Sequence, residues 1–507
     1  MKLASISRNP PAKTRAAGAT GTRLAGTSAP PTRLDRMFPL VTSRAYLFAI
    51  ALIVVAGSCI IAAAYWPGVM IDDTRWQYQQ VVDHAFEDWH PPLMAWMWSR
   101  LAVIAPGPAP MLVLQLALYW IGIALIAWLA WRRGSPRLAV AIAGAGWLPA
   151  SFALTGTVLK DVLMAGFLLC ATGLLLCRTL VRRTALQAAM TAASILVIFA
   201  AAALRFNAFF ACLPLLLAAL PKPFTRTGPR LAATAIAATA ALMMSGPAVA
   251  ALLHAEKTGV DLSLIIFDLG GITEHAGVSQ FPDLGVRNPV GVNHRCYDPY
   301  EWDSYSDWAK QPCPLGFDRF QAFLDDEDVN AGALWVHAIA SHPIAYAQHR
   351  LTHFNLSTWF IVPEGPAFTA WSQSVPNPWG FHIRPNAIVS LVGEFADAAA
   401  ATPLGWPIFW ISVALAALIA GLATETPNEV RALAASAFLY GAAYLVVGVA
   451  TGVRYYFWTF TGAALAVLVL AVELRSHRLR VPARPTAIAA AVVALPTLIA
   501  IAARVAL

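Results

Sequence analysis

The stretch YWPGVMIDDTRWQYQQVVDHAFEDWHPPLMAWMW, residues 65–98, begins where the first long apolar run, residues 45–64, ends. It holds five of the chain's 27 acidic residues and two histidines: Asp72, Asp73, Asp83, Glu87, Asp88, His84 and His90. An apolar run of about 20 residues can cross a bilayer as a helix, so this stretch is expected at a membrane surface. Ionisable residues at such a place are a functional hypothesis by default. The alternative is a solvated loop with interfacial tryptophans.

The composition indicates a polytopic membrane protein. Of its 507 residues, 58% are hydrophobic and 12% are charged, whereas a soluble domain has about 25% charged residues. The mean hydropathy is +0.61. The net charge of +8 could suggest nucleic acid, but lysine and arginine cluster between apolar runs, which is the positive-inside pattern of membrane proteins. We therefore expect membrane lipid, and not nucleic acid, as a partner.

The apolar runs predict about eleven transmembrane helices, and the arginine clusters between them predict the orientation of those helices. The apolar runs lie at residues 45–64, 110–131, 138–154, 162–177, 186–204, 208–220, 231–253, 404–423, 432–450, 455–472 and 486–502. Every cluster of several arginines beside a run falls on the same side, which is the cytoplasmic side by the positive-inside rule. The N-terminus is then cytoplasmic, and residues 65–104 and 254–403 are extracytoplasmic.

The same reading divides the chain into four parts. Residues 1–44 are basic and aperiodic, which predicts a disordered cytoplasmic tail. Residues 45–253 form a transmembrane core that includes the first extracytoplasmic loop, residues 65–104. Residues 254–403 are too long for an ordinary connection and are expected to form an extracytoplasmic loop domain. Residues 404–507 carry the C-terminal transmembrane helices.

Two of the six cysteines, Cys296 and Cys313, lie in the polar segment 254–403. An extracytoplasmic compartment permits a disulfide between them, and two free thiols are the alternative. No C-x-x-C spacing indicates a zinc site. The histidines of this segment are expected to be structural: His337, His342, His349 and His353.

The predicted topology brings ionisable residues to the outer ends of several helices: Asp72, Asp73, His84, Glu87, Asp88, His90, Lys160, Asp161, Arg205 and Arg454. A carboxylate can take a proton from a hydroxyl group, and arginine and lysine can bind a phosphate. Structural alternatives remain for each. Lys160 and Asp161 could form an interfacial ion pair, Arg205 could belong to a turn, and His90 could shape the turn before Pro91.

The first loop resembles that of the GT-C glycosyltransferases, polytopic enzymes that take sugars from polyprenyl-phosphate carriers. The likeness rests on a P-G-x(4)-D-[ST]-x-x-Q element followed by H-P-P, here Pro67, Gly68, Asp73, Thr74, Gln77 and His90-Pro91-Pro92. The resemblance implies that Asp73 is the catalytic carboxylate, although the adjacent Asp72 leaves the position open by one residue. A Lys-Asp pair at 160–161 and an Arg-Tyr pair at 454–455 also match.

We therefore expect an all-α, GT-C-like, inverting glycosyltransferase of the bacterial inner membrane. It would transfer a sugar from a polyprenyl-phosphate carrier to an envelope glycan, lipid or protein outside the cytoplasm. Asp73 or Asp72 would be catalytic, and the expected substrate contacts are His90, Lys160, Asp161, Arg205, Arg454 and Tyr455. No metal ligand is assigned, because the first-loop acids and histidines match no ligand spacing. A divalent ion stays open, with Glu87 and Asp88 as a solvated or metal-proximal rim.

Other classes compete with this interpretation. The main alternative is a transporter or flippase of lipid-linked sugars, which should place its polar groups near the bilayer midplane. A noncatalytic assembly subunit and an O-antigen-ligase-like enzyme are further alternatives. The gathering of charge at one outer face favours the glycosyltransferase, and the first-loop acid argues against the ligase.

Overall fold

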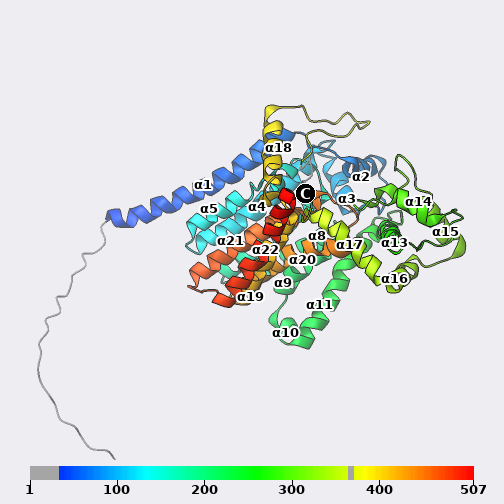
Figure 1. Ribbon diagram of the computed structural model, residues 1–507. Helices are drawn as coiled ribbons and strands as arrows, with labels where there is room; N and C mark the ends of the chain where they lie inside the picture. Colours follow the sequence, from blue (N-terminus) through cyan, green and yellow to red (C-terminus); the bar gives the residue numbers. More distant parts are fainter. Residues whose placement is uncertain (1–32, 364–369, 507) are drawn as a thin grey trace, which may run out of the picture. The chain divides into compact units, whose positions relative to one another are not determined.

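The computed structural model describes residues 33–363 and 370–506, and this part of the chain is built of helices and loops with three isolated bridges (Figure 1). The chain divides at residue 45 into two units, residues 1–45 and 46–507. Helix α1, Arg33–Tyr65, begins before the expected start at residue 45. The rest of the expected disordered tail, residues 1–32, lies outside the described residues.

Eight segments of the described chain are long and apolar enough to cross a membrane. They are Arg44–Tyr65, Ala109–Arg132, Lys160–Leu180, Thr184–Ala202, Gly228–Leu252, Asn428–Val447, Val453–Ser476 and Ala483–Ala506. Each coincides with one of the eleven expected spans. The fold is therefore that of an all-helical, multi-pass membrane protein.

The other three expected spans are shorter helices. The expected span 138–154 is divided into α5, Pro136–Ala145, and α6, Pro149–Leu154. Pro149 explains the break, because proline lacks an N–H and disfavours helical geometry in the residue before it. The expected spans 208–220 and 404–423 are α9, Phe209–Ala219, and α19, Pro407–Leu422.

Helix α7, Lys160–Cys177, is buried along most of its length and packs closely on α4, Ala109–Arg132. Glycines permit this approach. A β-carbon at Gly122 would lie 2.4 Å from the β-carbon of Leu169, and one at Gly173 would lie 2.7 Å from that of Leu125. Small residues at such contacts are typical of membrane helix pairs. The packing fixes the N-terminal end of α7, which carries Lys160.

The segment after the seventh expected span has a hydrophobic core of its own. Helix α13, Leu262–Ala276, contacts its neighbours α14, Pro289–Cys296, α15, Phe317–Glu327, α16, Ala331–Ser341, and α17, Pro343–Thr358 (Figure 1). Apolar side chains on or beside these helices form the core, among them Phe267, Tyr305 and Phe320. In contrast, α18, Ala387–Ala400, contributes to the larger membrane core. An independent domain 254–403 therefore stays a prediction.

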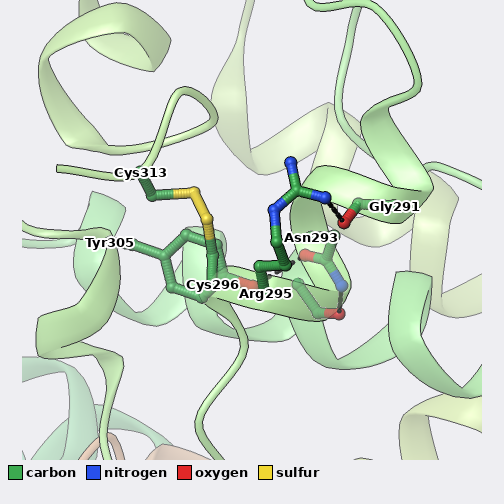
Figure 2. The surroundings of a disulfide bond; sticks show 7 residues. Gly291, Asn293, Arg295, Cys296, Tyr305 and Cys313 are labelled. Atoms are coloured by element: carbon green, nitrogen blue, oxygen red, sulfur yellow. Dashed lines mark hydrogen bonds between the residues drawn. A yellow bond between two sulfur atoms is a disulfide. The ribbon is translucent and has the colours of Figure 1, made fainter. Parts of the chain in front are cut away.

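A disulfide joins Cys296, at the end of α14, to Cys313 (Figure 2). The bridge closes the segment of residues 297–312. Tyr305 anchors the middle of this segment, because its hydroxyl group donates a hydrogen bond of 2.7 Å to Asn293. The Asn293 amide donates in turn to the carbonyl of Gly270 on α13, at 3.0 Å. The segment is thus fixed at both ends and at its centre.

A buried polar network connects this second core to the membrane helices. Arg350 lies 2.6 Å from Asp268 and donates a hydrogen bond of 2.6 Å to the carbonyl of Gly448, at the end of α20, Asn428–Val447. His349 lies 3.2 Å from Asp268. Burial raises the pKa of Asp268, but the charge of Arg350 and the hydrogen bonds hold it below its ordinary value. The network supports the connection 448–452, which leads to Arg454.

Candidate active site

Short backbone contacts fix the start of the first loop. The N–H of Val69 donates to the carbonyl of Gly156 at 3.1 Å, and the N–H of Val158 donates to the carbonyl of Val69 at 3.0 Å. The hydroxyl group of Thr74 donates to the carbonyl of Val158 at 2.7 Å. Helix α2, Asp72–Asp83, is therefore held beside the residues that precede Lys160.

Asp73 contacts two cations from distant parts of the chain. Arg454 places Nη1 3.0 Å from Oδ2 and Nη2 3.3 Å from Oδ1 of the carboxylate, a two-pronged contact. The Nζ atom of Lys160 lies 3.4 Å from Oδ2. Asp72 points elsewhere: its side chain is 69% exposed and pairs with Arg75 at 3.4 Å. The structure thus brings Asp73, and not Asp72, to the cations.

His90 lies against the same lysine. Its Nδ1 atom is 2.6 Å from the Nζ atom of Lys160. Burial and the positive charge of Lys160 lower the pKa of His90 to about 3, so the imidazole is neutral and can accept the hydrogen bond. Burial raises the pKa of Asp73, but the charges of Arg454 and Lys160 hold it well below its ordinary value. Asp73 is therefore a carboxylate at neutral pH.

A second ion pair adjoins the first. Arg205 pairs with Asp161, whose side chain is only 1% exposed. Burial lowers the pKa of Arg205, but the charge of Asp161 outweighs this effect and leaves it well above its ordinary value. The ring of Tyr455 lies 5.0 Å from the guanidinium carbon of Arg205 and 5.0 Å from that of Arg454. Its hydroxyl group also accepts a hydrogen bond of 3.2 Å from Arg454.

We call this group the charge cluster; its members are Asp73, His90, Lys160, Asp161, Arg205, Arg454 and Tyr455. With His90 neutral, three cations face two carboxylates, which leaves one positive charge in excess. The cationic side chains are 12–13% exposed, so they are largely desolvated but not fully buried. Such a site favours an anion, and arginine in particular suits the paired oxygens of a phosphate.

The remaining acids of the first loop lie outside the charge cluster. Asp88 accepts hydrogen bonds of 2.8 Å from both the N–H and the hydroxyl group of Thr258. Glu87 accepts a hydrogen bond of 3.1 Å from Gln80. Both acids therefore help to hold the loop in place, and their role as a solvated or metal-proximal rim stays a prediction. His84 is exposed at the end of α2.

Nothing in the geometry favours a metal ion at the charge cluster. No group of three or more His, Cys, Asp or Glu side chains that could hold a metal occurs among residues 33–363 and 370–506. Asp73 contacts Arg454 and Lys160 instead. Two positive charges at about 3 Å would repel a cation bound to the same carboxylate.

The sequence did not single out Asp303 and Trp371, which lie near the charge cluster. Asp303 is half-buried. Burial and the negative charge of Asp73 raise its pKa, and the charge of Arg454 lowers it less. The ring of Trp371 lies 5.8 Å from the guanidinium carbon of Arg454. Neither residue belongs to a recognisable motif, and both come from the long segment after the seventh expected span.

No protein-family model matches the chain, and no curated protein matches it. Among solved structures, the chain is similar to an oligosaccharyltransferase of Archaeoglobus fulgidus, with 13% identity and a TM-score of 0.34 over 90% of this chain and 55% of that one. It thus spans about half of that protein. It is also similar to ArnT from Cupriavidus metallidurans bound to undecaprenyl phosphate, with 13% identity and a TM-score of 0.31 over 84% and 77% of the two chains. Both likenesses are loose and carry no argument about function. The functional argument rests on the contacts within this chain.

Proposed function

We propose that this protein transfers a sugar from a polyprenyl-phosphate carrier to a hydroxyl group of a cell-envelope glycan, lipid or protein. The observation that carries the proposal is the convergence of Arg454 and Lys160 on Asp73. A base and two phosphate-binding cations are therefore in direct contact. Glycosyl transfer from a lipid phosphate needs both kinds of group at the same anomeric carbon.

The cations would hold the carrier phosphate. Arg454 offers two parallel N–H donors, and Lys160 offers a point charge. Arg205 adds a further positive charge nearby, since its guanidinium contacts the same Tyr455 ring as that of Arg454. As the bond between the anomeric carbon and the phosphate oxygen breaks, negative charge grows on the phosphate. Preorganised donors at that place lower the barrier, because they need little rearrangement in the transition state.

Asp73 would be the general base. The acceptor hydroxyl group gives its proton to the carboxylate, its oxygen forms the new bond to the anomeric carbon, and the phosphate leaves with the electron pair of the broken bond. Attack opposite to the leaving phosphate inverts the anomeric configuration. In the structure, Arg454 and Lys160 lower the pKa of Asp73. A bound phosphate competes for those donors, and a carboxylate that loses them becomes a stronger base.

The placement of the charge cluster favours an enzyme over a transporter or flippase. Lys160 is the first residue of α7, Arg205 follows α8, Thr184–Ala202, and Arg454 precedes α21, Phe457–Ser476. These positions are helix ends, whereas a transporter is expected to bind its substrate at broken helices near the midplane. By the positive-inside rule, the cluster would lie on the extracytoplasmic side of the bacterial inner membrane.

The test is sugar transfer in membranes that carry the wild-type protein, with radiolabelled polyprenyl-phosphate sugars as donors and a deletion strain as the background. We expect labelled acceptor with wild type and little with Asp73→Asn at matched expression. A parallel assay in proteoliposomes measures movement of the labelled carrier across the bilayer. Carrier movement without any sugar transfer would contradict the proposal and support the flippase.

A further inference from the structure

We propose that Asp303, Trp308 and Trp89 form a carbohydrate-binding subsite beside the charge cluster, and that this subsite receives the acceptor glycan. The assignment of the bound sugar to the acceptor rests on the function proposed above. The existence of a site for a pyranose ring does not, and the two can be tested separately.

Aromatic side chains form the wall of this subsite. Trp308 is 53% exposed and stands nearly perpendicular to Trp89, with ring centroids 5.2 Å apart and an angle of 87°. Buried Trp302 supports both rings, at 5.4 Å from Trp308 and 5.8 Å from Trp89. An exposed, rigid indole offers an apolar face and a polar edge at low entropic cost. The C–H groups of a pyranose ring can pack on such a face.

A carboxylate lies beside this wall. Asp303 directly follows Trp302 in the chain, and hydrogen bonding from the side chain of Trp308 lowers the pKa of its carboxyl group. Carboxylate oxygens accept strong hydrogen bonds from hydroxyl groups, so Asp303 can hold a sugar whose ring packs on Trp308. Asp303 also interacts electrostatically with Asp73 and Arg454. Because the N–H of Trp302 is hydrogen-bonded to the carbonyl of Val449, five residues before Arg454, a sugar held here would lie near the base and the phosphate-binding arginine.

The backbone keeps the subsite in register with the charge cluster. The N–H of Trp302 donates a hydrogen bond of 2.9 Å to the carbonyl of Val449. Glu301 forms an isolated antiparallel β-bridge with Ala450. Both partners lie shortly before Arg454 in the chain. On the other side, Trp89 is followed directly by His90, which contacts Lys160. Trp89 is thus adjacent in sequence to a residue of the charge cluster, and Trp302 is hydrogen-bonded to the segment that leads to Arg454.

The disulfide gives the subsite a rigid base. Trp302, Asp303 and Trp308 all lie in the segment that the bridge between Cys296 and Cys313 closes. Tyr305 inside the same segment is fully buried and bonded to Asn293. A short loop fixed at its ends and its centre loses little conformational entropy when it binds a ligand. This arrangement suits a binding loop better than a passive connection.

The test is saturation-transfer NMR with methyl glycosides of glucose, mannose, galactose and N-acetylglucosamine. The purified full-length protein is kept in lipid nanodiscs, because sugar-based detergents would compete. We expect saturation of at least one glycoside by wild type, loss of the signal in Trp308→Ala, and about tenfold weaker binding in Asp303→Asn, which corresponds to about 1.4 kcal/mol. Trp308→Phe keeps an aromatic face and should bind more strongly than Trp308→Ala. Trp76→Ala, which removes a tryptophan that is 55% exposed, is the matched control.

The outcomes separate this inference from the proposed function. Arg454→Ala removes a phosphate-binding group and should leave glycoside binding intact. If glycosides bind through Trp308 but no variant of the charge cluster changes sugar transfer, the subsite stands and the proposed function fails. Absence of binding by wild type, or equal binding by wild type and Trp308→Ala, overturns the subsite. In the transfer assay, Asp303→Asn should raise KM for the acceptor and leave KM for the donor unchanged; a rise for the donor alone would contradict the acceptor assignment.

Discussion

Arg454 holds the carboxylate of Asp73 with both terminal nitrogens, at 3.0 and 3.3 Å, although the two residues are 381 positions apart in the chain. Lys160 contacts the same carboxylate from a third region. The charge cluster therefore forms only when the first loop, the start of α7 and the residues just before α21 are all in place.

Replacing Asp73 should abolish most of the sugar transfer. Asp73→Asn keeps the shape of the side chain but removes the proton acceptor, and general-base catalysis contributes typically about 10²–10⁴ in rate. The measurement is kcat in membranes at matched expression. Asp72→Asn and Asp83→Asn are the controls, since both side chains lie outside the charge cluster. An active Asp73→Asn beside an inactive Asp72→Asn would move the base by one residue.

Arg454→Lys should impair transfer even though the charge is kept. Lysine replaces a two-pronged contact with a single one, which weakens the hold on both Asp73 and a phosphate. Arg454→Ala should be slower still. The control is Arg75→Lys, because Arg75 pairs with the exposed Asp72. Wild-type rates for both Arg454 variants would show that Arg454 only anchors the chain at the membrane interface.

Acid should destabilise the protein partly through buried histidines. Burial lowers the pKa of both His90 and His353 from 6.5 to about 3. Between pH 6.5 and 3 the unfolded chain therefore binds more protons than the folded one, so stability falls as the pH falls. The stability that ionised Asp73 provides is lost only below pH 3.8, which is the ordinary pKa of an aspartate side chain. His90→Asn should flatten the decline of the melting temperature between pH 6.5 and 4.

The control for the pH experiment is His84→Asn, which replaces an exposed histidine of the same loop. Its melting temperature should follow the wild-type pH profile. Parallel profiles for wild type and His90→Asn would show that His90 titrates normally and is not buried against Lys160.

Loss of the disulfide should destabilise the segment that carries Asp303. Chain entropy predicts about 3 kcal/mol for a closed loop of this length, so Cys296→Ser should lower the melting temperature and remove the mobility shift on reduction. Cys59→Ser is the control, since Cys59 is a free cysteine. Alkylation of both Cys296 and Cys313 in freshly prepared, unreduced protein would refute the bridge.

The topology can be tested with impermeant thiol reagents in intact cells. Asp325, in α15, is exposed and should be labelled as Asp325→Cys, because the segment 254–403 is expected outside the cytoplasm. Arg183→Cys should react only after permeabilisation, since Arg183 belongs to an arginine cluster assigned to the cytoplasm. Both variants are made with Cys59→Ser. The opposite pattern would invert the whole membrane arrangement.

Apolar runs of sufficient length predicted the membrane helices well, because crossing a bilayer is a requirement on composition and length alone. Eight expected spans are long helices in the structure. The number of full-length spans was harder to predict where proline interrupts an apolar run, as Pro149 does between α5 and α6.

Helical periodicity explains why Asp73, and not Asp72, contacts the cations, whereas the catalytic role of either acid stays a prediction. On α2, Thr74, Gln77 and Val81 are buried, whereas Asp72 and Trp76 are exposed. Residues four apart lie on one face of a helix, so Asp73 shares the inner face with Gln77. In contrast, no periodicity could reveal Asp303, because its approach to Asp73 depends on how the segment 297–312 docks on residues 449–450.

The long separation between Asp73 and Arg454 has a consequence for biosynthesis. A ribosome adds about 5–20 residues per second, so the 381 positions between them take roughly 20–80 s to synthesise. During that time the nascent chain already carries the carboxylate, while the arginine that completes the contact is still missing. The charge cluster is therefore completed only after residue 454 has been synthesised, and a chain arrested before that residue would lack the arginine that contacts Asp73.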